Sequence, residues 1–123
     1  MLGPAGSIYL SKQDFTKYLH LHLSGAVGAS DFLSQDSFQL LHRSPDQEDY
    51  AMGWRLMDET LLAEHNLSRT EQVLYHGGNT GIASARTLIL PDRKLSIFIA
   101  LNLDVTRWKD LQKLLFERLQ ITE

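Results

Sequence analysis

The fold follows mainly from one part of the sequence, which begins with Tyr75-His76-Gly77-Gly78-Asn79-Thr80-Gly81. Residues 82–101 follow it and contain the turn Pro91-Asp92-Arg93-Lys94. Residues 72–76 are rich in β-formers and predict a strand that stops at the glycines. Residues 82–90 and 95–101 predict two more strands, because Pro91 stands where a type I turn accepts proline. The second half of the chain is therefore expected to contain an antiparallel hairpin with a further strand beside it.

The first half of the chain predicts one clear helix. Ser11 is suited to cap a helix over residues 12–23, which ends at Ser24-Gly25 and Gly28. Its apolar face is made by residues three and four apart, with a histidine among them: Phe15, Tyr18, Leu19, His22 and Leu23. Residues 29–49 predict a long surface loop with one helical turn over residues 38–41. Residues 50–56 predict a strand, and residues 61–68 fit no single element.

In the C-terminal part of the chain, the apolar residues recur at the spacing of an α-helix. From Asp104 on, one stripe of the predicted helix is apolar, and Asp104 or Thr106 could cap its start. The stripe consists of Val105, Trp108, Leu111, Leu115 and Leu119. The order of elements predicts an α+β fold: an antiparallel sheet of three to four strands, with the N-terminal and C-terminal helices packed on one face.

Composition limits the function classes. With 123 residues, the chain is expected to form a single domain over residues 1–123. The net charge of −3 and the scattered lysines and arginines argue against a nucleic-acid or anionic-membrane partner. There are no cysteines, which excludes disulfides and thiolate chemistry. No signal peptide or membrane-length apolar run occurs in this chain, so it is expected to be soluble; its compartment, extracytoplasmic or not, stays open.

Three segments, in this order, resemble the C-terminal part of the serine β-lactamase and penicillin-binding-protein superfamily, in its class C and esterase-like branch. The first is Pro4-Ala5-Gly6-Ser7-Ile8-Tyr9-Leu10-Ser11, leading into a helix with Asp14 and Phe15. The second is Tyr50-Ala51-Met52-Gly53-Trp54. The third is His76-Gly77-Gly78-Asn79-Thr80-Gly81, followed by Ser84, Pro91-Asp92-Arg93 and the strand ending at Asn102. The resemblance implies a partial β-lactamase-like fold.

The resemblance also implies roles for the third segment. His76 would donate a hydrogen bond to a substrate carboxylate or assist proton transfer, and the strand edge at Gly77, Gly78 and Thr80 would bind an extended acyl substrate. The backbone amide of Asn79 would be one of two oxyanion donors. Removal of one such donor typically costs about 3 kcal/mol of barrier.

The family's nucleophile is not in this sequence. Its members use a serine followed three positions later by a lysine, and none of the ten serines here is followed in this way. We therefore expect a C-terminal fragment or truncated relative of such a hydrolase that is inactive alone. Its expected partners are a missing N-terminal half or a second copy of the chain, and an acyl ligand such as a β-lactam, ester or peptide. No cofactor is expected.

Two alternatives stay open. One is a non-catalytic α+β module that uses an exposed sheet surface for self-association or binding. The other is an unrelated small α+β domain with a ligand cleft.

The other candidate residues have simpler interpretations. His20 and His22 are two apart and face different directions on a helix, and His42 and His65 lack carboxylates at ligand spacing, so no metal site is predicted. Trp54 and Trp108 are expected to be core anchors, with Trp54 near a groove as the second interpretation. Ser84 and Thr80 are expected to make backbone hydrogen bonds.

Overall fold

The structure is a computed structural model that describes residues 3, 6, 8–46 and 48–122. Pro4, Ala5 and Ser7 of the first segment lie outside the described residues. The elements are α1 (Lys12–Ala26), α2 (Gln35–His42), β1 (Arg55–Leu56), α3 (Glu59–Glu64), β2 (Leu74–Asn79), β3 (Ser84–Leu90), the 3-10 turn η2 (Pro91–Arg93), β4 (Leu95–Leu101) and α4 (Trp108–Arg118). The predicted α+β class is confirmed, with four strands in the sheet.

The sheet has the order β1-β2-β3-β4, and all neighbours are antiparallel. The β3–β4 hairpin is confirmed, although its turn is the 3-10 turn η2 followed by Lys94 in the left-handed region (φ 51°). The prediction that the preceding strand stops at the glycines was wrong. β2 continues to Asn79, because Gly77 and Gly78 pair with Arg86 and Ala85 of β3.

The strand predicted over residues 50–56 is much shorter. Only Arg55 and Leu56 pair with β2, and Tyr50 makes an isolated bridge to Arg55. Between them the chain turns back on itself: the Ala51 amide donates to the Trp54 carbonyl at 2.7 Å, and Gly53 has a φ of 85°. A left-handed glycine in the middle of the segment ends the extended run.

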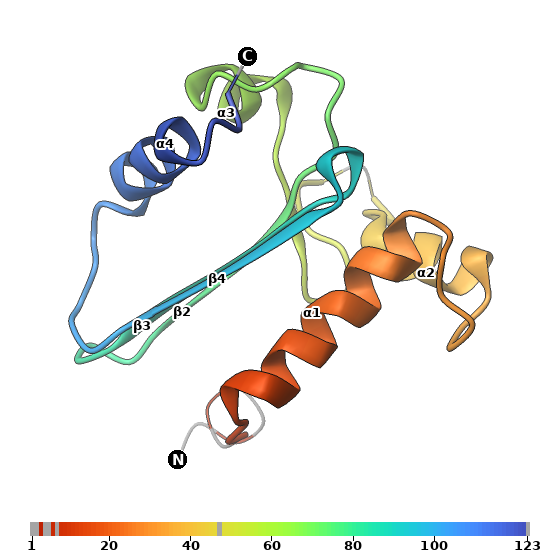
Figure 1. Ribbon diagram of the computed structural model, residues 1–123, viewed down its shortest axis with the longest axis horizontal. Helices are drawn as coiled ribbons and strands as arrows, with labels where there is room; N and C mark the ends of the chain where they lie inside the picture. Colours follow the sequence, from red (N-terminus) through yellow and green to blue (C-terminus); the bar gives the residue numbers. More distant parts are fainter. Residues whose placement is uncertain (1–2, 4–5, 7, 47, 123) are drawn as a thin grey trace.

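The helices cover both faces of the sheet, not one face as the sequence suggested. Figure 1 shows the sheet nearly edge-on, with α3 and α4 on one side and α1 and α2 on the other. On the α1 side, Leu19 packs with Trp54, Leu74 and Ile89. On the other side, Phe116 of α4 packs with Leu88.

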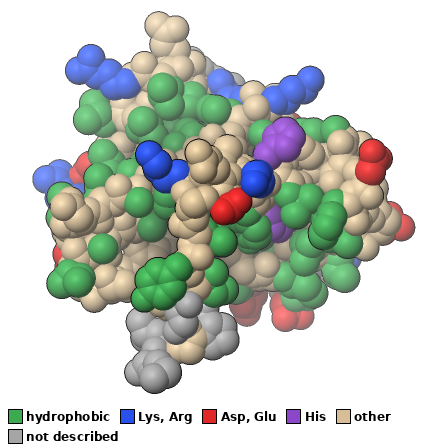
Figure 2. All heavy atoms as spheres, turned by 60° about the horizontal axis from the view of Figure 1, so that its bottom comes forward, with side chains coloured by type: hydrophobic (Ala, Val, Ile, Leu, Met, Phe, Trp, Pro, Cys, Tyr) green, Lys and Arg blue, Asp and Glu red, His purple; other side chains and the backbone are tan. Residues whose placement is uncertain are grey.

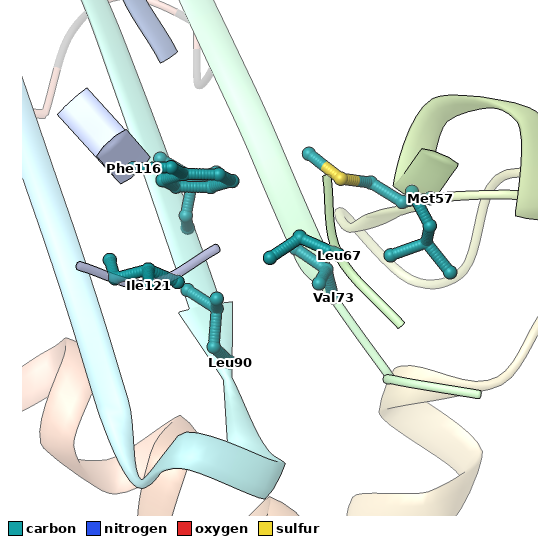
Figure 3. Close-up of a cluster of buried hydrophobic side chains, with 8 residues drawn as sticks. Met57, Leu67, Val73, Leu90, Phe116 and Ile121 are labelled. Carbon is teal, nitrogen blue, oxygen red and sulfur yellow. The ribbon is translucent and has the colours of Figure 1, made fainter. Parts of the chain in front are cut away.

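The second cluster links the C-terminal segment to the region around α3. Figure 3 shows its side chains and labels Met57, Leu67, Val73, Leu90, Phe116 and Ile121. Both faces of β3 are thus buried, because Leu88 and Leu90 point to one side and Ile89 to the other. This double burial explains the consecutive apolar residues of the strand.

The predicted N-cap of α1 is confirmed, whereas the predicted N-cap of α4 is wrong. Ser11 caps α1 as expected, with its hydroxyl accepting from the Asp14 amide, and the helix runs through Gly25 to Ala26. α2 is longer than the predicted turn, and α3 occupies the start of the ambiguous region. α4 begins at Trp108 without a side-chain cap, so neither Asp104 nor Thr106 caps it. Its buried residues are Gln112 and Phe116, whereas Leu119 of the predicted stripe is 51% exposed.

Candidate functional site

His76 lies on a groove between α1 and the sheet, which we call the α1 groove. The groove has a volume of about 610 Å³. Its apolar lining includes four aromatic rings, those of Phe15, Tyr18, Trp54 and Phe98, and its polar lining consists of Ser11, Lys12, His76 and Thr87. Trp54 is thus both a buried core residue and part of a groove wall. A cleft of this size, with an apolar lining and a few polar groups, is typical of small-molecule sites.

The strand register explains why His76 faces the groove. His76 pairs with Thr87, which pairs in turn with Phe98, so these three side chains share the α1 face of the sheet. Figure 2 shows the molecule with the lower side of Figure 1 turned forward. Hydrophobic side chains and histidines lie at the surface in this view.

Tyr50 is a site residue that the sequence analysis missed. Its hydroxyl lies 3.4 Å from His76 Nε2, and the two rings meet edge to face at 6.3 Å. Arg55 lies over the Tyr50 ring at 5.4 Å and pairs with Asp49 at 3.0 Å. Tyr50 and His76 are 26 residues apart in sequence, so no local pattern could have joined them.

The outer edge of β2 is open beside the groove. β1 pairs only with Leu74 and Tyr75, and no other strand of the described residues covers the edge from His76 to Asn79. Hydrogen-bonding directions alternate along a strand. The Thr80 amide donates inward to Ala83, and the Val73 carbonyl accepts outward from Met57. The amides of Gly77 and Asn79 consequently point to the open edge, as an oxyanion donor or a strand-addition site requires.

The side chain of Asn79 fixes this end of the strand. Its Nδ2 donates to Asp104 at 2.6 Å, and its Oδ1 accepts from the Gly81 amide at 2.6 Å. Thr80 exchanges hydrogen bonds with Ala83, and Ser84 Oγ accepts from the Val105 amide. The prediction of backbone hydrogen bonds for Thr80 and Ser84 is thus confirmed. Ser84 is buried, which makes it a poor nucleophile.

The two glycines lie in different surroundings. A Cβ on Gly78 would meet nothing within 4 Å, whereas one on Gly77 would lie 3.3 Å from Nη1 of Arg86. Gly77 therefore leaves room for the guanidinium on the far face of the sheet, in addition to presenting its backbone at the edge.

His22 and His42 form a buried pair that joins α1 to α2. Nδ1 of His22 and Nε2 of His42 lie 2.9 Å apart, and both rings contact Trp54. Burial lowers the pKa of both rings; for His42, burial first and the neighbouring His22 second bring the pKa to about 4. Among the described residues no three metal-binding side chains gather. The lowered pKa values indicate that the pair is a neutral contact between α1 and α2. His20 stays exposed.

Comparisons with family models, with curated proteins and with solved structures found no match for this chain. In the part of the chain that the structure describes, no helix has the length and apolar character needed to span a membrane.

Proposed function

We propose that this chain forms the substrate-binding wall of a β-lactamase-like serine hydrolase. The observation that supports this proposal best is that the α1 groove, which His76 lines, lies beside the open edge of β2, to which the Asn79 amide points. The resemblance of residues 76–81 to the family's third motif assigns the same two groups to substrate binding.

The lining of the groove indicates the kind of ligand. The aromatic rings favour an apolar acyl group, and Lys12 and His76 are the groove's cation and hydrogen-bond donor for a carboxylate. An extended acyl chain can add along β2, where the backbone of Gly77 and Asn79 is free to pair. β-Lactams, peptides and esters that carry a carboxylate all have this combination.

The chemistry of acyl transfer requires an activated hydroxyl, which this sequence does not provide in the family's form. No serine is followed three positions later by lysine, and removal of the nucleophile from such a unit removes nearly all catalysis. Turnover would need a second polypeptide segment that brings the serine and the lysine to the Asn79 amide.

Tryptophan fluorescence and a chromogenic assay test the proposal together. Benzylpenicillin should change the emission of Trp54 in the groove, with a response that is retained in Trp108→Phe and lost in Trp54→Phe. His76→Ala should weaken binding by roughly tenfold, the value of one hydrogen bond to a charged group. A chromogenic cephalosporin and ester should not be hydrolysed by the chain alone. Turnover by the chain, or an unchanged Trp54 signal, would contradict the proposal.

A second candidate function is self-association through β4. The outer edge of this strand pairs with no strand of the described residues, and none of its seven residues is charged. Natural edge strands usually carry lysine, proline or a bulge that prevents pairing. The unprotected edge favours a homo-oligomer.

A further inference from the structure

A second hollow lies on the face of the sheet opposite the α1 groove, between β2–β3 and the helices α3 and α4. We call it the α3–α4 hollow. Its volume is about 130 Å³, and its polar lining includes His65, Arg86, Lys109 and Gln112. Arg86 belongs to this face because it pairs with Gly77, the neighbour of the groove-facing His76. At about 30 Å³ per water molecule, the space equals roughly four waters.

Unpartnered polar atoms concentrate in this hollow. Across the described residues, four buried side-chain nitrogen or oxygen atoms have no hydrogen-bond partner. Three of them belong to its lining: His65 Nε2, Arg86 Nε and Gln112 Nε2. His65 is only 2% exposed and Gln112 only 4%. An unsatisfied buried polar atom costs about 1–3 kcal/mol, so three in one place favour the binding of a polar ligand there.

The charge of the hollow favours an anion. The Arg86 guanidinium lies between the rings of Tyr75 and Trp108, at 5.4 and 5.1 Å, and has no carboxylate partner among the described residues. Burial lowers the pKa of Arg86, yet a guanidinium stays protonated at neutral pH. Lys109 is already paired with Glu64. Arg86 thus supplies an uncompensated positive charge.

His65 requires that the ligand also carry a hydrogen-bond donor. Its Nδ1 lies 2.8 Å from the Leu61 carbonyl, so this nitrogen carries the proton. In the neutral ring Nε2 is then an acceptor. The hollow therefore presents two donors, Arg86 Nε and Gln112 Nε2, beside one acceptor. An oxyanion that also carries a hydroxyl satisfies all three.

We propose that the α3–α4 hollow binds a hydrogen phosphate group, either as the free anion or as the singly ionised end of a small phosphate monoester, which keeps one P–OH group. The oxyanion oxygens accept from Arg86 and Gln112, and the P–OH group donates to His65. Sulfate has the same shape but no proton near neutral pH, so it would place an oxygen lone pair against His65 Nε2.

Isothermal titration calorimetry of the whole chain near neutral pH tests this site with three probes: inorganic phosphate, O-phosphoserine and sulfate. Phosphate should bind at least about tenfold more tightly than sulfate, the difference expected for one hydrogen bond to a charged group. Binding of O-phosphoserine as well would identify a monoester site, and binding of inorganic phosphate alone a free-anion site. Equal affinity for sulfate, or binding of neither phosphate compound, would overturn the proposal.

Matched variants assign the binding to the hollow. Gln112→Met keeps the length of the side chain and should weaken phosphate binding by roughly tenfold; Arg86→Met should abolish it. Ser44→Ala is the control, because Ser44 Oγ is the one unpartnered buried atom of the four that lies outside this lining. If Arg86→Met does not fold, Gln112→Met and the control suffice. Unchanged affinity in Gln112→Met would refute the assignment.

Discussion

At the scale of single residues, Gly25 shows packing overriding helix propensity. It lies inside α1, where alanine would normally favour the helix by about 1 kcal/mol. A Cβ at this position, however, would overlap the ring of Phe38 from α2. We predict that Gly25→Ala lowers the free energy of unfolding by about 1–3 kcal/mol in urea denaturation, the usual cost of overpacking. Gly78→Ala, where a Cβ meets open space, should change stability far less. Equal stability of Gly25→Ala and the wild type would show that α1 and α2 do not pack this closely.

At the scale of elements, the contact between α1 and α2 depends on two neutral histidines. Because burial lowers their pKa values below the ordinary 6.5, to about 4 for His42, the unfolded chain binds more protons between these limits. The contribution of the histidine pair to the free energy of unfolding is therefore fully present above pH 6.5. It decreases as the pH falls towards 4, by roughly 3 kcal/mol for His42. Urea denaturation at several pH values measures the effect. His42→Gln should flatten this slope, and His20→Gln, an exposed neighbour, should preserve it. An unaltered slope in His42→Gln would assign the acid sensitivity to other groups.

At the scale of the whole molecule, the open edge of β4 is the surface that we propose for self-association. Two copies can pair antiparallel through this edge, and a register centred on Ile99 would place Lys94 opposite Asp104 of the partner. We predict a dimer in size-exclusion chromatography with light scattering. Ala100→Lys, which adds a charge to an exposed position of the edge, should give a monomer. Gln39→Lys on α2 is the charge-matched control and should stay dimeric. A monodisperse wild-type monomer would exclude self-association.

The sequence predicted the parts of this molecule that local interactions determine. The bounds of β4 and the capping of α1 by Ser11 agree with the structure, because a proline turn and an N-cap act within a few residues. The layer order and the groove could not be derived in this way, since contacts such as His22 with His42 join residues 20 positions apart. One available signal was overlooked: the consecutive apolar residues Leu88, Ile89 and Leu90 indicate a strand buried on both faces.

A residue-resolved titration would show whether an acyl ligand binds where the α1 groove lies beside β2. Amide and imidazole chemical shifts of the labelled protein would be followed by nuclear magnetic resonance while benzylpenicillin is added. We expect the largest changes at the Gly77 and Asn79 amides, the His76 ring and Phe98, where the open edge of β2 lies beside the α1 groove. Changes confined to other surfaces, or none at saturating ligand, would contradict this expectation.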